Sequence, residues 1–342
     1  MTRVATLCAP LRSERGVALM MVLWIFRVLT VLVAEFSRGM RDEAVATQNM
    51  AEEVQARGVA LAGMGQGIYR TLRAREDNTD EDATDIDPDS WTPDGTWHEG
   101  QYGGGSFSVR LIDESGKISL NRADEALLRR VLTNVGVTGD EQEEIADAIL
   151  DWRDADSMKR LHGAESDFYL GLPEPYAAKN GPFDSVDELL LVRGITRDLF
   201  FGTGDRSSSG PIGGLKTNRD KGPPIALGQI FSVFNKTGNI NIRNAPEAVL
   251  RAVMGGGEDD VQAVLEARSN DPGSALTLMQ AKVGDETIAR RLVDRRASTV
   301  AVDARAVMQG AQIQARVGAV VDVGEDAEGF RVLRWIDRLP AL

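Results

Sequence analysis

The sequence predicts an α+β protein in which a long N-terminal helix packs on a small antiparallel β-sheet, with a large all-α domain inserted into one connection of the sheet. Three observations predict this class. An apolar run near the N-terminus continues unbroken into an amphipathic segment, two stretches with strand-like alternation lie far apart, and a helical pattern between them occurs twice. The 342 residues, 42% of them hydrophobic, suffice for two or three separate cores.

Charge and cysteine content limit the classes of partner and chemistry. The chain has 52 acidic and 39 basic residues and a formal net charge of -13, which repels nucleic-acid phosphates and gains nothing from anionic lipid. Cys8 is the single cysteine, so no intramolecular disulfide can form. The sequence contains no G-x-S-x-G, H-E-x-x-H or phosphate-loop motif, and its histidines are His98 and His162. We therefore expect a protein that is not an enzyme and does not bind nucleic acid.

The N-terminal helix is predicted in two parts. Residues 17–36 contain only Arg27 and Glu35 as charged residues, and twenty residues are about the length that crosses a hydrocarbon core. No small-residue cleavage site follows, so we expect this span to be retained as a single-pass anchor. The arginines before it place the N-terminus in the cytoplasm and the bulk of the chain on the far side. Residues 37–75 continue the helix.

One face of the continuation is apolar, which predicts that it packs on another element. The residues of this face are Met50, Val54, Leu61, Ile68 and Leu72.

The junction before the apolar run resembles the class III leader of type IV pilins and of the pseudopilins of type II secretion systems. A basic residue and Gly16 stand directly ahead of Val17. The resemblance implies that a prepilin peptidase removes residues 1–16, cutting between Gly16 and Val17, and that the span stays in the inner membrane. Removal of this leader also removes the only cysteine, so an oxidising periplasm poses no difficulty.

Most members of that family have a glutamate at the fifth position after the cut, where this chain has Met21. The large K subunit of the general secretion pathway typically lacks this glutamate, and the V-A-L-x-x-V-L-W run that begins at Val17 also looks like that subunit. Arg27 departs from the pattern, because a lone arginine in mid-membrane costs about 2.5 to 3.5 kcal/mol. Two interpretations stay open: Arg27 pairs with a glutamate of a neighbouring subunit, or it draws in water and headgroups.

Residues 76–104 are acidic and lack an apolar period, which predicts a surface loop with solvated charge. Residues 105–120 alternate apolar and polar side chains and are predicted to form a strand followed by a hairpin turn at Ser115-Gly116. Residues 297–338 alternate in the same way and turn at 324–329, which predicts a second β-hairpin. These two stretches are the predicted sheet.

A helical repeat fills the region between the strands. GKISLNRADEALLRRVL, which begins at Gly116, matches GNINIRNAPEAVLRAVM, which begins at Gly238, with eight identities in seventeen positions. Helical repeats are therefore predicted at 121–201 and 231–292, joined by a Gly/Ser/Pro-rich linker at 202–230. The repeats resemble the helix-hairpin-helix units of DNA-binding proteins, and a DNA-uptake protein is one alternative function. Four acids surround the best hairpin and would repel phosphate: Asp184, Asp187, Glu188 and Asp198.

One cluster of acids is a candidate metal site. Its five members, within seventeen residues, are Asp151, Asp154, Asp156, Glu165 and Asp167. Calcium needs six to eight oxygen ligands, and the EF-hand register is absent. From spacing alone, two interpretations are equally good. The acids form a metal site, or they are solvated charges at helix ends, with Asp167 as a cap. Resemblance to the K subunit, whose α-domain binds calcium, favours a structural Ca²⁺ site.

The resemblance extends over nearly the whole processed chain and implies the pilin-like fold with an inserted α-domain. It also implies a function: a minor pseudopilin at the tip of the type II secretion pseudopilus, which initiates or caps assembly for protein export across the outer membrane. The implied partners are the other minor pseudopilins, the major pseudopilin, the prepilin peptidase and the inner-membrane secretion platform. A plain single-pass anchor with a periplasmic calcium-binding domain is the other alternative.

Overall fold

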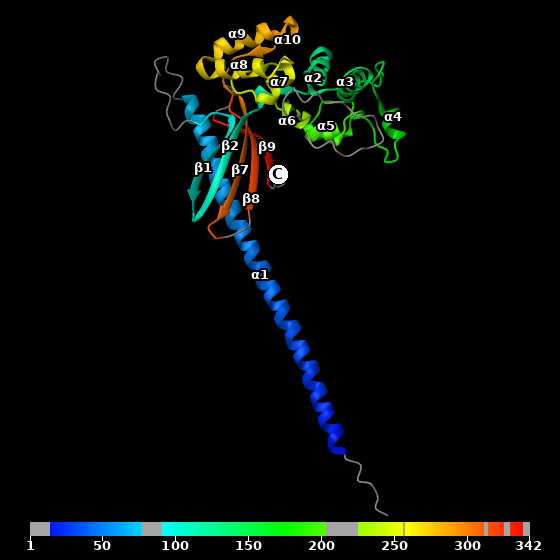
Figure 1. Ribbon diagram of the computed structural model, residues 1–342, viewed down its shortest axis with the longest axis vertical. Helices are drawn as coiled ribbons and strands as arrows, with labels where there is room; N and C mark the ends of the chain where they lie inside the picture. The colour runs from blue at the N-terminus through cyan, green and yellow to red at the C-terminus, as the bar shows by residue number, and fades with distance from the viewer. Residues whose placement is uncertain are drawn as a thin grey trace, which may run out of the picture.

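The structure is a computed structural model that describes residues 14–76, 91–202, 225–255, 257–310, 314–324 and 329–337. A single long helix, α1 (Glu14–Glu76), runs from the N-terminal end of the described chain to a β-sheet, and a helical body lies beyond the far end of that sheet (Figure 1). The class is α+β, as the sequence predicts, and the helical body is inserted between two neighbouring strands of the sheet.

The sheet has five strands, and every neighbouring pair is antiparallel, in the order β1-β2-β7-β8-β9. Its strands are β1 (Asp94–Tyr102), β2 (Gly105–Asp113), β7 (Thr299–Met308), β8 (Gln314–Asp322) and β9 (Arg331–Ile336). The pairing of β8 with β9 confirms the predicted C-terminal hairpin.

The loop predicted over residues 76–104 is wrong for residues 94–102, which form strand β1. Residues 94–102 pair with β2 through a two-residue turn at Gly103 and Gly104. The φ angles of these glycines, 57° and 80°, are positive, as this hairpin turn requires, and residues with side chains rarely adopt them. As an edge strand, β1 leaves most of its side chains half-buried or exposed, so its sequence lacks the alternation of a core strand. Residues 77–90 of the predicted loop lie outside the described part of the chain.

The C-terminal third of α1 packs on one face of the sheet and builds a core with strands β2, β7 and β8. The helix side of this core consists of Val59, Ala60, Met64 and Ile68. Two glycines allow the close approach: a Cβ at Gly63 would lie 2.6 Å from a ring carbon of Phe107, and one at Gly67 would lie 3.0 Å from Val109. Phe107 cannot retreat, because its ring also covers Gly100 of β1, where a Cβ would lie 2.3 Å away.

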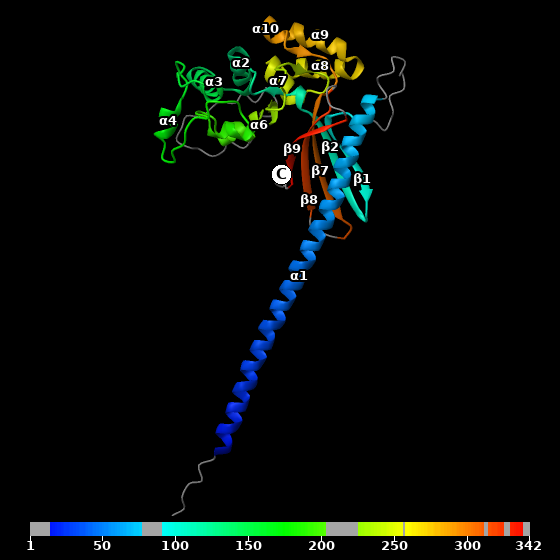
Figure 2. The same ribbon diagram turned by 180° about the vertical axis from the view of Figure 1, so that it is seen from behind.

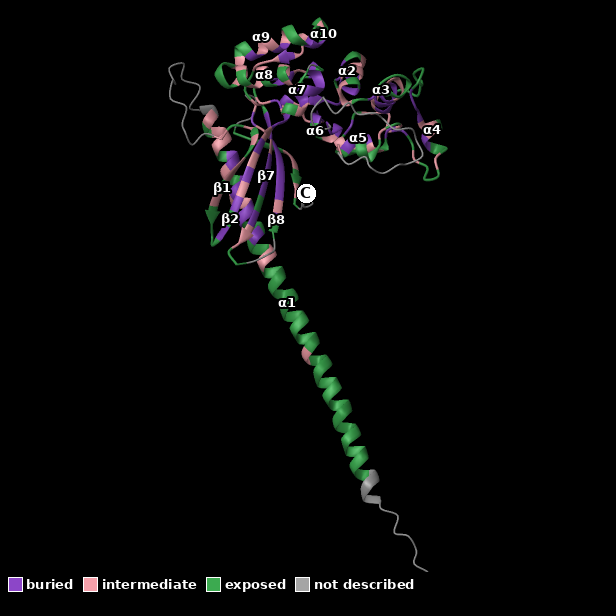
Figure 3. Cartoon of the chain, viewed as in Figure 1, coloured by how far each residue is buried: buried purple, intermediate pink, exposed green. Residues whose placement is uncertain are grey.

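The packed face of α1 is shorter than the sequence predicts. Ile68 is buried, whereas Met50 and Val54 are 69% and 64% exposed. Figure 3 shows the change along the helix, which is exposed over most of its length and buried only where it passes the sheet. The helix reaches the sheet near Ala56, so apolar residues before that point pack against no other element of the described chain.

The insertion begins directly after β2, where the predicted hairpin at Ser115-Gly116 is wrong. The Asp113 carboxylate accepts a hydrogen bond from the Ser115 backbone N–H (2.8 Å) and caps a 3₁₀ turn, η1 (Glu114–Gly116). The chain then leaves the sheet through the short strand β3 (Ile118–Ser119), which pairs in parallel with β4 (Phe231–Ser232).

Each helical repeat is closed by such a pair of two-residue parallel strands. Between β3 and β4 lie α2 (Glu125–Val135), α3 (Asp140–Arg153), α4 (Ser166–Leu170), η2 (Val186–Leu191), α5 (Arg197–Phe201) and α6 (Leu227–Ile230). The second repeat consists of β5 (Ile240–Asn241), α7 (Glu247–Met254), α8 (Glu258–Asn270), α9 (Pro272–Val283), α10 (Glu286–Ala289) and β6 (Leu292–Val293).

The two repeats share one hydrophobic core and form a single body. Helix α2 packs on α7, and the Arg130 guanidinium donates hydrogen bonds to the backbone carbonyls of Val253, Met254 and Val283 across the interface. Within the described chain, this core is separate from the core of the sheet.

Buried polar side chains join the helical insertion to the sheet. Asn241 donates to the Asp113 carboxylate (2.7 Å), and Ser232 donates to the Glu114 carboxylate (2.5 Å). Asn235 donates to three backbone carbonyls around the same turn. Because buried polar groups are stable only with their partners in place, this network favours one orientation of the insertion relative to the sheet.

Candidate functional site

The candidate site lies in the loop between α3 and α4, residues 154–165. Two buried acids one turn apart on α3 hold this loop through its backbone. The carboxylate of Asp147 accepts from the His162 N–H (3.1 Å), and that of Asp151 accepts from the Arg160 N–H (3.2 Å). Gly163 packs so closely that a Cβ there would lie 1.9 Å from an Asp151 oxygen. Asp151 therefore fixes the loop.

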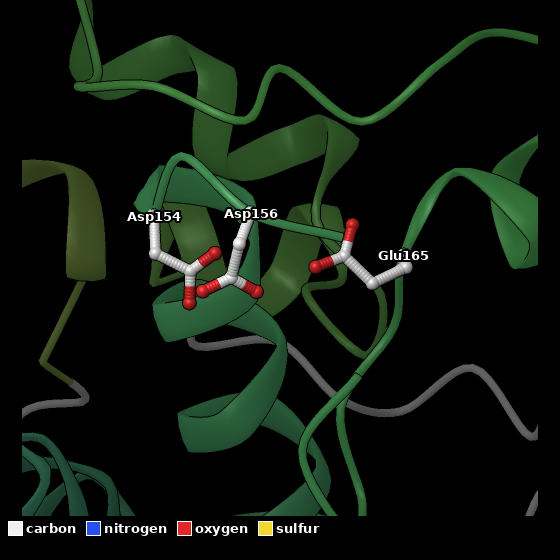
Figure 4. Close-up of side chains that lie close together, drawn as sticks. All are labelled: Asp154, Asp156 and Glu165. Carbon is white, nitrogen blue, oxygen red and sulfur yellow. The ribbon is translucent and has the colours of Figure 1, made fainter. Parts of the chain in front are cut away.

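Three acids of the loop converge (Figure 4). Asp154, Asp156 and Glu165 each place one carboxylate oxygen within 4.8 Å of the others. Glu165 is only 4% exposed, and within the described chain both of its oxygens and Oδ1 of Asp154 are buried without a hydrogen-bond partner. Removing an ionised carboxylate from water without a partner is costly, so this arrangement fits a bound cation. Oxygen donors of this kind are the ligands that calcium prefers.

Asn180 is a further oxygen-bearing residue at this loop, and sequence reasoning missed it. Its side-chain NH₂ donates to the Asp156 carbonyl (2.6 Å) and to the Ser157 hydroxyl (3.2 Å), which holds the amide beside the cluster. Its Oδ1 is buried without a partner among the described residues. Its φ of 49° is the only positive φ of a non-glycine residue in the described chain, and such strain is typical of functional positions. Asn180 lies 24 residues from Asp156, and the Asn-Gly turn that contains it was the available signal.

Burial, and then the charges of neighbouring acids, raises the pKa of Asp151, Asp154 and Glu165. Burial raises the pKa of Asp151 to about 6, although the hydrogen bond from the Arg160 backbone opposes the shift. Burial is also the largest cause that raises the pKa of Glu165, followed by the charges of Asp151, Asp154 and Asp156. The pKa of Asp154 is raised by burial and then by Asp156. A cation bound among these groups would favour their ionised forms.

The remaining predicted site residues lie elsewhere. Asp167 is exposed and outside the cluster, and its carboxylate accepts from the Phe168 N–H (2.8 Å). Arg27 is exposed on α1 and has no ion pair with any residue that the structure describes. Gly16 and Val17 lie in the first turns of α1, where the structure describes the backbone alone, and residues 1–13 are outside the described chain.

The best helix-hairpin-helix candidate has an exposed turn that packs on α3 through one side. Gly194 lies against α3, where a Cβ would be 2.5 Å from the Ile145 side chain. The neighbouring Arg193 guanidinium donates inward, to the Gly163 carbonyl (3.2 Å) and to Glu144 (3.0 Å). This cation supports the α3–α4 loop.

Comparisons with known proteins agree on one family. Residues 105–201 match the family model described as "Type II secretion system (T2SS), protein K". The type II secretion system protein K of Pectobacterium carotovorum is 29% identical over 205 residues, which cover 55% of this chain and 60% of the relative. The protein K of Pseudomonas aeruginosa is 29% identical over 195 residues, covering 53% and 58%. The matched segments thus span about 60% of the length of these relatives.

The fold has a counterpart among solved structures. A chain in the crystal structure of the GspK-GspI-GspJ complex of enterotoxigenic Escherichia coli aligns with a TM-score of 0.57 and 18% sequence identity. The alignment covers 85% of this chain and 98% of that chain. It supports the pilin-like fold with an inserted helical domain, and the comparisons together confirm the predicted resemblance to the K subunit.

Proposed function

We propose that this chain, a relative of the K proteins of type II secretion systems, is a minor pseudopilin at the tip of the pseudopilus. There it initiates or caps the filament that supports protein export across the outer membrane. The observation that carries the proposal is the position of the helical insertion, which lies beyond the end of the sheet that is farthest from the start of α1 (Figure 2).

The dimensions of α1 support a filament subunit. Its 63 residues correspond to about 95 Å at 1.5 Å per residue, several times the thickness of a hydrocarbon core. It is the one helix in the described chain that is long and apolar enough to cross a membrane. Most residues between Phe36 and Ala56 are exposed, and we expect this part of the helix surface to pack on α1 helices of neighbouring subunits. The insertion would obstruct a further subunit above this one, which favours the tip.

The proposed role is structural, with the chain anchored in the inner membrane by one span and its bulk in the periplasm. The proposed partners are the other minor pseudopilins, the major pseudopilin, the prepilin peptidase and the inner-membrane platform. The similar solved chain comes from a complex with two other subunits, GspI and GspJ. Assembly with proteins of that kind is the interaction we expect here.

We also propose that the α3–α4 loop binds a structural Ca²⁺. Asp154, Asp156, Glu165 and Asn180 would supply side-chain oxygens, while Asp151 holds the loop in place. The buried, unpartnered oxygens of Glu165 support this assignment, because a solvated charge cluster would leave its carboxylates in contact with water. The ion would supply charge neutralisation and rigidity, with no catalytic role.

Arg27 is proposed to pair with the glutamate of a neighbouring subunit in the membrane. It lies exposed on a helix whose surrounding side chains are apolar, and Met21 stands where the family usually has its own glutamate. Arg27→Leu should insert readily and yet assemble less well with its partners. Undiminished co-purification of the minor pseudopilins with Arg27→Leu would contradict the pairing, whereas rescue by a Glu→Gln change in a partner would support it.

N-terminal sequencing of the protein from membranes tests the proposed function. A mature chain that begins at Val17 agrees with processing by a prepilin peptidase. A chain that begins at Met1, or at any residue beyond Phe36, contradicts the pseudopilin assignment. Recovery of minor pseudopilins with the affinity-tagged full chain then tests membership in the tip complex.

A further inference from the structure

Among the described residues, no long helix covers the face of the sheet opposite α1, and this face carries an excess of arginines. Alternation along the strands puts Phe107, Val109 and Leu111 against α1, so the residues between them point to this outer face. The strand registers then align Trp97, Arg110 and Asp303 in one row across β1, β2 and β7. The next row contains Glu99, Ser108, Arg305 and Arg316 on β1, β2, β7 and β8.

Two of these arginines, Arg110 and Arg316, share one carboxylate within the fold. Asp303 is buried between them and accepts from Arg110 Nε (2.9 Å) on one side and from Arg316 Nε (2.8 Å) and Nη2 (2.7 Å) on the other. This shared carboxylate leaves the group with a net charge of +1 even before Arg305 is included.

Among the arginines of this face, Arg305 has a positive charge that no described acid balances directly. It stands directly opposite Arg316 in the β7–β8 register, and like charges at such a position destabilise a sheet. No acid lies within ion-pair distance of Arg305 in the part of the chain that the structure describes. Its guanidinium instead stacks on Trp97, 4.3 Å from the ring centroid, and Arg110 lies 4.7 Å from the same ring. A cation held on an aromatic ring keeps its donors available.

The surroundings of Arg305 supply further hydrogen-bond donors. A shallow hollow on this face is lined by Arg305 together with the hydroxyl-bearing Ser106 and Ser108 and the amide-bearing Gln314. A guanidinium with neighbouring hydroxyl and amide donors matches a carboxylate, which accepts two parallel hydrogen bonds from arginine. The positive group also stands out from a chain whose net charge is -13.

We propose that this outer sheet face, centred on Arg305, is the docking surface for a carboxylate-bearing surface of a neighbouring minor pseudopilin. The inference rests on the proposed function and adds the face that meets the partner and the chemistry of that contact. An incoming carboxylate would neutralise Arg305 and relieve its repulsion with Arg316. Because the rest of this acidic chain repels acidic partners, a local basic surface also selects the orientation of encounter.

The test compares charge variants of the full chain, co-expressed with the minor pseudopilins of the same secretion system and purified from membranes in detergent. Arg305→Glu should reduce recovery of the partners at least tenfold at 100 mM NaCl, and Arg305→Gln should give a smaller loss. Arg290→Glu is the matched control, because Arg290 is also an exposed arginine (side chain 74% exposed) but directly follows α10, away from this face, and already pairs with Glu286. The wild-type complex should weaken at 500 mM NaCl.

Thermal unfolding separates this role from a structural one. Arg305→Gln should leave the melting temperature of the isolated chain unchanged or raise it, since it removes the repulsion with Arg316. Should Arg305→Glu fold poorly, the binding loss with Arg305→Gln decides the question.

Full recovery of partners with both Arg305 variants would overturn the proposed surface, as would an equal loss with Arg290→Glu. If the wild-type chain recovers no pseudopilin, the proposed function fails. If the wild type and the Arg305 variants recover partners equally, the docking surface alone fails.

Discussion

The α3–α4 loop allows a direct test of which acids bind calcium, through the matched pair Glu165→Gln and Asp167→Asn. Both acids belong to the cluster that the sequence predicts, yet Glu165 is 4% exposed with two unpartnered oxygens and Asp167 is exposed on α4. Each change removes one negative charge, at positions only two residues apart. A response to Glu165→Gln alone would show that geometry, and not the charge of the loop, creates the site.

The size of the expected effect follows from the calcium affinity of an extracellular module, with Kd about 0.1 to 1 mM. At 5 mM calcium, such a site stabilises the folded chain by about 1 to 2 kcal/mol. For a domain of this size, that corresponds to a rise in melting temperature of roughly 2 to 8 °C. Glu165→Gln should remove most of this rise. In chelator it should stabilise the protein by about 1 kcal/mol, since a buried unpaired amide costs less than a buried unpaired carboxylate.

The assay is thermal unfolding of the full chain in detergent with 5 mM CaCl₂ or 5 mM EGTA, monitored by circular dichroism. Asp167→Asn should keep the calcium response of the wild type. The reasoning is refuted if wild-type protein melts at the same temperature in both buffers, or if the two variants lose the response equally.

Three further outcomes are expected. Gly63→Ala should destabilise the chain by about 1 to 2 kcal/mol in thermal or urea unfolding, because the added methyl group collides with the sheet, whereas Gly65→Ala on the open side of the same helix should stabilise it by about 0.5 to 1 kcal/mol. The calcium-induced rise in melting temperature should shrink as the pH falls from 7 towards 5, because burial and then neighbouring carboxylates raise the pKa of Asp154 and Glu165, and protons compete with the ion. In chelator the melting temperature itself should rise as the pH falls, since a carboxyl group whose pKa is raised in the folded state contributes stability that is lost as the pH rises through that pKa. The same pH dependence of the melting temperature in both buffers would contradict the assignment. Gly16→Leu should block leader removal, seen as retention of the precursor on gels, and normal processing of that variant would count against a leader junction there.

The features that sequence reasoning found are those with a long or repeated pattern. The apolar and amphipathic run gives a continuous α1, the alternation after residue 314 gives β8 and β9, and the internal match places α2 and α7 at equivalent positions. Each pattern depends on local periodicity, which the backbone satisfies regardless of what lies beside it.

The errors arose where the outcome depended on the neighbours of a segment. Strand β1 has little alternation, because it pairs on one edge only and covers Phe107 with Gly100 instead of with a large side chain. Met50 and Val54 fall on the predicted apolar face, but the sheet ends before it reaches them. The Ser115-Gly116 turn forms no hairpin, because Asp113 and Asn241 direct the chain into the insertion.

The candidate metal site divides in the same way. By itself the sequence determined that acids are concentrated after α3, since that is a matter of composition and spacing. Only the tertiary structure decided that Asp151 holds the loop, that Asp154, Asp156 and Glu165 converge without Asp167, and that Asn180 comes from a distant turn to bind the Asp156 carbonyl. These roles depend on hydrogen bonds between segments up to 24 residues apart, and such pairings are set by how the segments pack and not by their positions in the sequence.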